Sequence, residues 1–363
     1  MRKVSIDQLK KILLDLPTNP RVLVSGNFAT PKVLLAAVDE TLPEYTLHML
    51  NAQKGIPDRE GVHYESAFLG PGMRNHPRLN YVPSRLSLLP VLIRDHLVPD
   101  LVLLHTSQPR FDTVSLGTEV NILPAAIEAV RARGGLVIAQ SNSNMPYTYG
   151  DSQIYENEID FMIECEEPLA IHNPLHLSTN AKAIGERIAA LVGDHSTLQM
   201  GIGDVPDAVL ELLKDRKGMR IWTEMFSDGV LNLHKSGALD EEVPITALQV
   251  DLYDQANASR VGGHIYSGFG GSTDFIVGSL HSRGGQSFMA LPSWHKKSNT
   301  STIIPLIEEA VTSFQHSYVV TENGVAACFG RSQNEQAHNL IEFAAHPDAR
   351  ESLRSSAVQM GIF

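Results

Sequence analysis

One carboxylate stands in an otherwise apolar stretch near the middle of the chain. Glu224 lies within Ile-Trp-Thr-Glu-Met-Phe (221–226), at the end of a predicted strand (219–226). A carboxylate in such a place is paired, exposed at a strand end, or functional. Because the turn Ser227-Asp228-Gly229 follows at once, Glu224 is either a rim residue that caps this turn or a group that acts on a ligand.

A tight glycine turn lies upstream, at Gly201-Ile202-Gly203. Without side chains the backbone turns sharply and a ligand can come close. Asp204 is the expected N-cap of the following helix, and Val205 begins its apolar face. Backbone N–H groups at a helix N-terminus favour an anion. The alternative is an ordinary strand-to-helix turn, because Pro206 stands where a dinucleotide fingerprint has its third glycine.

The turn and the carboxylate belong to one β-α-β step. From Gly201 to Glu224 there are 23 positions (224 − 201), which is one helix plus one return strand. Such a step can bring the end of the second strand beside the turn that ends the first. We therefore expect both at the sheet edge where open α/β folds bind ligands.

A second glycine loop and a basic spot follow. In Gly268-Phe269-Gly270-Gly271, consecutive N–H groups can form a nest for an oxyanion or phosphate, with a flexible turn as the alternative. Lys296-Lys297 is either a functional cation pair or a solvated loop. HExxH, CxxC and GxSxG are absent, and Pro174 separates His172 from His176. The sequence therefore predicts no metal site and no nucleophile elbow.

Strands that alternate with helices predict an α/β fold with parallel sheets. A plausible linker (168–174) separates two α/β series, and residues 51–85 are expected to be irregular. The expected elements are a helix with Ile6, Leu9, Leu13 and Leu16 on one face; strands at 21–26, 101–105, 136–140, 245–252, 288–291 and 318–320; helices from Pro31 and at 122–133, 181–192 and 337–345; and a last helix capped by His346-Pro347-Asp348.

Composition limits the possible partners and the compartment. With 363 residues, 43% hydrophobic and 19% charged, the chain is long enough for two domains. A net charge of −12 argues against nucleic acid as the main partner. Two cysteines, Cys165 and Cys328, give no disulfide framework and fit a reducing cytoplasm. Charges interrupt the first residues and no apolar run has membrane-spanning length, so we expect neither a signal peptide nor a membrane partner.

A series of motifs in order along the chain resembles the acetyl-CoA hydrolase/transferase family of family I coenzyme A transferases. It is most similar to the 4-hydroxybutyrate and butyrate branch, in a shortened form. The resemblance covers nearly the whole chain, and its motifs are FLGPGMR (68–74), SLG (115–117), NMPYTYGDSQIYENEID (144–160), GIGDVPDAV, TEMFSDG, ALQVDL, SGFGGSTDF, GGQSFMALPS, YVVTENGVA and HPDAR.

The resemblance implies a mechanism and a site. Two similar open parallel-sheet α/β domains, 1–172 and 173–363, would form the active site at their interface. The nucleophile of the TEM motif is Glu224, which would form an acyl anhydride and then a glutamyl-CoA thioester. Gly271 is the expected donor to the thioester oxygen. The residues implied to contact CoA or the oxyanion are Gly201, Ile202, Gly203, Asp204, Val205, Leu248, Gly270, Gly271 and Lys296.

The implied activity is acyl-CoA:carboxylate CoA transfer in short-chain fatty acid metabolism, with CoA thioester as substrate and no cofactor. Partners would be an acyl-CoA and a small carboxylic acid, and a homodimer is possible. A segment that the family carries between Gly237 and Ile245 is missing. Six positions depart from the family pattern: Tyr155, Asp254, Gln286, Thr302, Asn323 and Gln336. An acyl-CoA hydrolase and an inactive CoA-binding paralogue therefore stay open as alternatives.

Overall fold

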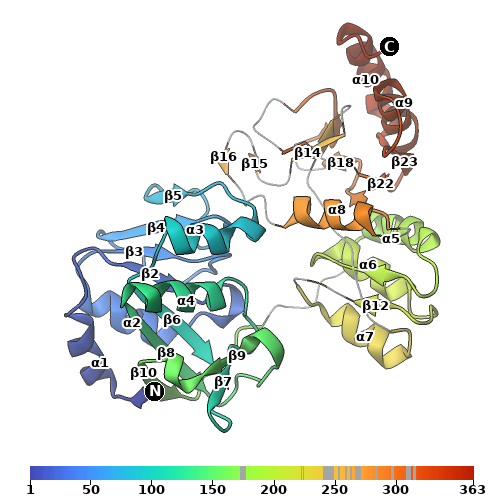
Figure 1. Ribbon diagram of the computed structural model, residues 1–363. Coiled ribbons are helices and arrows are strands. Elements are labelled where there is room, and N and C mark those ends of the chain that lie inside the picture. Colours follow the sequence, from blue (N-terminus) through green and yellow to red (C-terminus); the bar gives the residue numbers. More distant parts are fainter. Residues whose placement is uncertain are drawn as a thin grey trace. The chain divides into compact units, whose positions relative to one another are not determined.

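The chain forms two compact units in a computed structural model (Figure 1). Unit 1 comprises Met1–His172 and Val261–Gly270, and unit 2 comprises Asn173–Arg260 and Gly271–Phe363. The residues that the structure describes are 1–171, 177–221, 223, 225–239, 249–251, 254–257, 260–261, 264–265, 271–282, 285–295, 298–307, 312–313 and 316–363.

Unit 1 is built on one sheet of eight strands, in the order β1-β10-β8-β6-β2-β3-β4-β5. Every neighbouring pair is parallel. A separate antiparallel pair joins β7 and β9. The strands of unit 1 are β1 (Arg2–Lys3), β2 (Arg21–Val24), β3 (Tyr45–His48), β4 (Val62–Ser66), β5 (Leu79–Tyr81), β6 (Leu101–Thr106), β7 (Thr113–Ser115), β8 (Leu136–Asn142), β9 (Gln153–Tyr155) and β10 (Phe161–Cys165).

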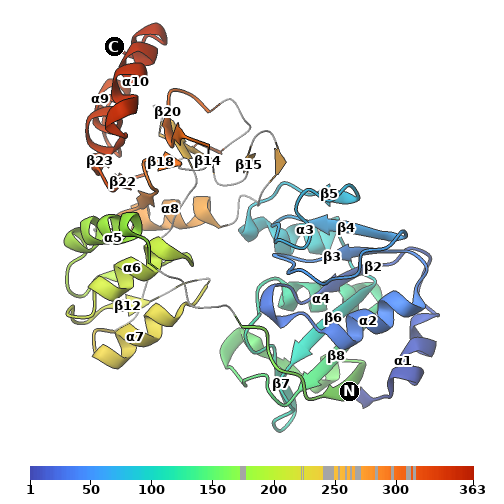
Figure 2. The same ribbon diagram turned by 180° about the vertical axis from the view of Figure 1, so that it is seen from behind.

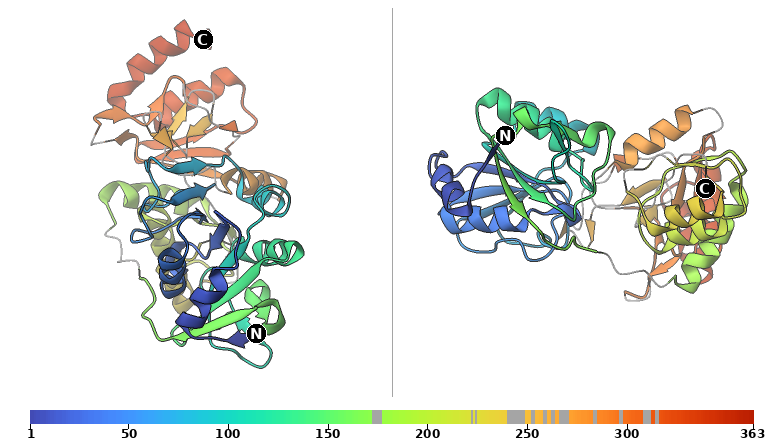
Figure 3. Two further views of the ribbon diagram at one scale, coloured as in Figure 1. Left: turned by 90° about the vertical axis from the view of Figure 1, so that its left-hand side faces the viewer. Right: turned by 90° about the horizontal axis from the view of Figure 1, so that it is seen from below.

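Helices cover both faces of this sheet, as parallel sheets require. They are α1 (Ile6–Leu13), α2 (Lys32–Thr41), α3 (Leu89–Asp95) and α4 (Leu123–Arg133). One apolar cluster joins α1 and α2 to the sheet, and a second joins α3 and α4 to it. Figures 1 and 2 show these two pairs from opposite sides, and the right view of Figure 3 shows the sheet between them.

The helix predicted from the first leucines is confirmed, because Leu9 and Leu13 are fully buried. A capping box between Ser5 and Gln8 begins it, and Leu16 lies in the turn beyond it. The prediction that 51–85 is irregular is wrong in part, because β4 and β5 lie there. The buried Glu65 in β4 broke the apolar pattern expected of a buried strand.

Unit 2 contains shorter sheets. β11 pairs in parallel with β12, and β17 pairs in parallel with β22, which pairs antiparallel with β23. A four-stranded sheet has the order β20-β13-β14-β21, and β18 pairs antiparallel with β19. The strands of unit 2 are β11 (Thr197–Leu198), β12 (Arg220–Ile221), β13 (Gln249–Asp251), β14 (Gln255–Asn257), β17 (Phe288–Ala290), β18 (Trp294–His295), β19 (Thr300–Ser301), β20 (Ile303–Ile304), β21 (Thr312–Ser313), β22 (Tyr318–Thr321) and β23 (Gly324–Ala327). β15 (Arg260–Val261) lies at the sequence boundary between the units, and β16 (His264–Ile265) belongs to unit 1.

The helices of unit 2 enclose two further apolar clusters, one with α5 to α7 and one with α9 and α10. They are α5 (Thr179–Leu191), α6 (Asp204–Leu212), α7 (Asp228–Ser236), α8 (Ser272–His281), α9 (Gln333–Asn339), a π-helical turn (Leu340–Ala344) and α10 (Pro347–Gln359). As predicted, His346 caps the last helix, accepting the Asp348 N–H on its side chain. The α/β class with parallel sheets is confirmed; in unit 2 the parallel pairs are accompanied by antiparallel ones.

Candidate active site

Two parallel strands of unit 2 end side by side. In the β11–β12 pair Thr197 lies opposite Arg220, and Leu198 opposite Ile221. Two residues further along, the Thr223 hydroxyl donates to the Met200 carbonyl oxygen at 2.7 Å and accepts from the Met200 N–H at 3.4 Å. The same hydroxyl lies 2.9 Å from the Met225 carbonyl oxygen. The strand end that leads into Gly201 is therefore tied to the residues before and after position 224.

The predicted glycine turn is present between β11 and α6. Gly203 has φ 127°, a conformation that favours glycine, and a Cβ there would meet open space. Gly203 itself is the N-cap of α6, so the expectation that Asp204 caps the helix is wrong by one residue. Asp204 and Asp207 both lie in the first helical turn, where carboxylates interact favourably with the helix dipole.

Three buried oxygens around these strand ends have no hydrogen-bond partner among the described residues. They are Gln199 Oε1, Asp207 Oδ1 and Ser227 Oγ. Gln199 is only 3% exposed and directly precedes the turn. Buried polar atoms are normally paired, so these three oxygens are candidates for contacts with a ligand.

The second glycine loop leads into α8. Gly271 is buried and is the N-cap of this helix, and a Cβ there would lie 2.8 Å from the Phe275 ring. The Thr273 hydroxyl oxygen is buried, again without a partner in the described part of the chain. The predicted residues Glu224, Leu248, Gly270 and Lys296 lie outside the described residues.

The segment that leads to Lys296 is held by a buried turn. Ser293, fully buried, donates its N–H at 2.9 Å and its hydroxyl at 2.7 Å to the Glu322 carboxylate. Asn323 Nδ2 donates to the Ser293 hydroxyl oxygen at 2.6 Å. Asn323, which departs from the family's aromatic residue, therefore has a defined structural partner here.

Asp254 stands where the resemblance implies glycine, and its backbone conformation is one that favours glycine. Its φ is 58°, in the left-handed region. Its carboxylate compensates by accepting the His316 N–H at 2.9 Å and by lying 2.7 Å from His316 Nδ1. Both residues are buried. Burial, with the Asp254 charge nearby, raises the pKa of the Cys328 thiol.

The other departures have local partners or lie at the surface. Thr302 is buried and donates its hydroxyl to the Pro292 carbonyl oxygen at 2.6 Å. Gln336 Nε2 donates to the carbonyl oxygens of Cys328 and Arg331. Gln286 and Tyr155 are exposed. Thr302 and Gln336 thus fill structural places in which an arginine would need different partners.

Unit 1 has its own polar edge, at the point where the strand order reverses between β2 and β6. Asn51 Nδ2 donates to Asn27 Oδ1 at 3.0 Å, and Asn121 Nδ2 donates to Glu119 Oε1 at 3.1 Å. All three asparagines have positive φ. Burial raises the pKa of the Glu119 carboxyl. These residues form no motif in the sequence, so none of them was predicted as a site residue.

Neither metal ligation nor a membrane span has support in the part of the chain that the structure describes. No group of three or more His, Cys, Asp or Glu residues there has a geometry for a metal ion. No helix there is long and apolar enough to cross a bilayer. Cys165 and Cys328 are free thiols.

Sequence reasoning missed Thr223, Gln199 and Glu322. Thr223 is the first residue of the TEM motif, in which only the role of Glu224 was assigned, and Gln199 is a polar residue between Leu198 and Met200, which was the available signal. Glu322 carried no such signal, since its partner Ser293 lies 29 positions away in the chain.

Comparison with known proteins identifies the family of this chain. The acetyl-CoA hydrolase/transferase C-terminal domain matches residues 242–357. The 4-hydroxybutyrate coenzyme A transferase of Clostridium kluyveri is 32% identical, over 95% of each chain. The succinyl-CoA:acetate/propanoyl-CoA:succinate CoA transferase of Fasciola hepatica is 32% identical over 93% of this chain and 84% of its own.

A solved structure agrees with the fold. The 4-hydroxybutyrate CoA-transferase of Porphyromonas gingivalis has a TM-score of 0.79 and 26% identity, with 99% of this chain and 98% of its own covered. The resemblance carried by the ordered motifs is therefore confirmed. This chain belongs to the acetyl-CoA hydrolase/transferase family of coenzyme A transferases.

Proposed function

We propose that the chain is an acyl-CoA:carboxylate CoA-transferase for short-chain acids, with Glu224 as nucleophile. One observation carries the proposal: the ends of β11 and β12 are joined through Thr223, whose next residue is Glu224, beside the strand end that enters the glycine turn. A nucleophile and a set of backbone N–H donors are the two parts that covalent acyl transfer requires.

The proposed reaction has balanced steps. A Glu224 carboxylate oxygen attacks the thioester carbonyl carbon, the C–S bond breaks, and CoA leaves as thiolate from an acyl-glutamyl anhydride. The thiolate then attacks the glutamyl carbonyl carbon and releases the original acid as carboxylate. The resulting glutamyl-CoA thioester is attacked by an acceptor carboxylate, and the same steps run in reverse. Negative charge develops on the attacked carbonyl oxygen each time, so preorganised N–H donors stabilise it.

Charge assigns different parts of CoA to the two proposed contact regions. Asp204 and Asp207 lie in the first turn of α6, so a phosphate at the glycine turn would meet two carboxylates. An uncharged part of the substrate, such as the thioester or the pantetheine amides, suits Gly201, Ile202, Gly203 and Val205 better. In this proposal Lys296 binds the phosphates of CoA. The backbone N–H groups of Gly270 and Gly271 donate to the thioester oxygen, and Leu248 contacts the acyl chain.

Covalent labelling tests the nucleophile directly. The protein is incubated with acetyl-CoA, treated with borohydride, digested and analysed by mass spectrometry. We expect reduction at Glu224 in the wild type and none in Glu224→Ala, which should keep its fold but lose turnover. Glu211→Gln, at an exposed position of α6, is the matched control and should behave as wild type. An active wild-type enzyme with unmodified Glu224 contradicts the proposal.

Hydrolysis is the second candidate, since the matched family includes acetyl-CoA hydrolases by name. Water would replace the acceptor acid in the last step. Release of free CoA measured with and without acetate separates the two: release that requires an acid supports transfer, and release without any acid supports hydrolysis. The acyl group, a cytoplasmic location, a homodimer and the 1–172 and 173–363 CoA-transferase domains stay predictions.

A further inference from the structure

We propose that Thr223 is a positioning residue, whose hydroxyl fixes Glu224 relative to the glycine turn. This inference rests on the proposed role of Glu224 as nucleophile. It concerns the hydroxyl group itself, not the bulk of the side chain.

The side chain of Thr223 connects two segments of the backbone. Its hydroxyl bridges two backbone segments, donating to Met200 at 2.7 Å and lying 2.9 Å from the Met225 carbonyl oxygen. A hydroxyl has one proton, so the two carbonyl oxygens share it or compete for it. The Met200 N–H adds a contact in the opposite direction, at 3.4 Å.

The partners of Thr223 lie next to the two parts of the proposed site. Met200 directly precedes Gly201, while Thr223 and Met225 are the residues on either side of Glu224. Among the described residues the β11–β12 ladder ends at Leu198 and Ile221. Thr223 continues the connection through its side chain. The β-branched side chain has few rotamers, which makes this link stiff.

A loosened link should reduce the rate of the covalent step more than it weakens substrate binding. Attack requires the carboxylate oxygen at near-contact distance from the thioester carbon, and a displacement of about 1 Å can lower a rate by about 100-fold. CoA binding depends on many contacts away from position 224. A change confined to the covalent step lowers kcat and leaves KM nearly unchanged.

Three variants separate the hydroxyl from the rest of the side chain. Thr223→Val keeps the shape and removes the hydroxyl, whereas Thr223→Ser keeps the hydroxyl and removes the methyl group. Thr197→Val makes the same exchange at an exposed position of the partner strand β11 and is the matched control. Each is measured for thermal unfolding, for kcat and KM with acetyl-CoA, and for the rate of borohydride-trapped modification at Glu224.

We expect Thr223→Val to trap Glu224 about 10- to 100-fold more slowly, with KM changed less than about threefold. Thr223→Ser should recover most of the rate, and Thr197→Val should match the wild type. Equal trapping rates in Thr223→Val and wild type overturn the inference. A trapping rate that is also about 10- to 100-fold slower in Thr223→Ser overturns the inference as well, because this variant keeps the hydroxyl. That result can be obtained even if Thr223→Val does not fold. A wild type that is not modified at Glu224 overturns the proposed function as well.

Discussion

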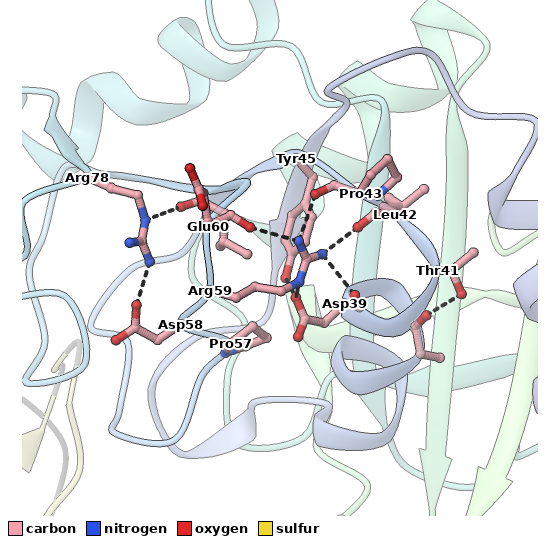
Figure 4. A network of polar contacts seen from close by, with 12 residues as sticks. Asp39, Thr41, Leu42, Pro43, Tyr45, Pro57, Asp58, Arg59, Glu60 and Arg78 are labelled. Carbon is pink, nitrogen blue, oxygen red and sulfur yellow. Dashed lines mark hydrogen bonds and ion pairs between the residues drawn. The ribbon is translucent and has the colours of Figure 1, made fainter.

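Arg59 holds the end of α2 with nearly all of its hydrogen-bonding capacity. Its guanidinium donates to Asp39 Oδ1 at 2.9 Å and to the carbonyl oxygens of Asp39, Leu42, Pro43 and Glu60. Figure 4 shows the group between the last turn of the helix and the loop that leads to β4. The carbonyls at a helix C-terminus have no partner within the helix, so a cation there caps it.

The number of contacts sets the size of the effect. A hydrogen bond contributes about 0.5–1.5 kcal/mol net, so five of them contribute about 2.5–7.5 kcal/mol if water replaces none. The Arg59 side chain is 35% exposed, and water will therefore satisfy some carbonyls after truncation. We expect Arg59→Ala to lower the free energy of unfolding of unit 1 by about 3 kcal/mol. With a urea m-value of about 2 kcal/mol/M, the midpoint should fall by about 1.5 M.

The assay must distinguish the two units. The two tryptophans, Trp222 and Trp294, both belong to unit 2, so tryptophan fluorescence follows that unit. Hydrogen exchange of a peptide containing Tyr45–His48 (β3), measured across a urea series, follows unit 1. Arg59→Ala should shift the exchange transition and leave the fluorescence transition in place.

Two further variants define what would refute this reasoning. Arg59→Lys keeps the charge but not the planar fork, and should lose most of the stability. Arg94→Ala removes an exposed arginine whose carboxylate partner is Asp95, and should change the free energy by less than about 1 kcal/mol. An unchanged midpoint in Arg59→Ala, or full stability in Arg59→Lys, shows that the carbonyl contacts do not hold the helix end.

Two more outcomes are expected in unit 1. Burial alone would raise the pKa of Glu65, but the bonds and charges of His48 and Arg21 outweigh it and hold that pKa below its usual range. The carboxylate therefore adds stability above its unfolded pKa of about 4.3, and this stability is lost as the pH falls through the lower folded pKa. In Glu65→Gln the urea midpoint should therefore depend less on pH between about pH 2 and 5. Gly26→Ala should cost about 1–3 kcal/mol in the exchange assay of unit 1, because its Cβ would lie 2.0 Å from the Leu50 carbonyl oxygen. Gly193→Ala in unit 2 meets no atom within 4 Å and should leave the fluorescence midpoint of that unit unchanged.

Local pattern was sufficient where one apolar face determines an element. Leu9 and Leu13 identified α1, and the run from Leu101 identified β6. β4 was missed because Glu65 and His63 gave it a polar appearance. Glu65 is tolerated there because Arg21 of β2 forms an ion pair with it and His48 of β3 forms a hydrogen bond with it, and no single stretch of sequence contains that information.

In the candidate site, too, some residues could be predicted from the sequence and others could not. Glu224 and the glycines follow from ordered motifs, since their types are fixed by chemistry and backbone conformation. The role of Thr223 does not follow from the TEM motif that contains it, because its partners are backbone atoms and any residue supplies a carbonyl oxygen. The roles of Asp254 and Asn323 likewise depend on His316 and Ser293, which become neighbours only in the fold.

The pairing of β1 with β10 sets an order for folding during synthesis. Arg2 pairs with Phe161 and Lys3 with Met162, so the edge strand cannot be placed until about 160 residues beyond it have been made. At about 5–20 residues per second, a ribosome needs roughly 8–30 s to reach that point. Throughout that time the segment Arg2–Lys3 has no β10 to pair with. Once β10 has formed, its outer edge stays open to strands of other chains until this short segment returns to cover it.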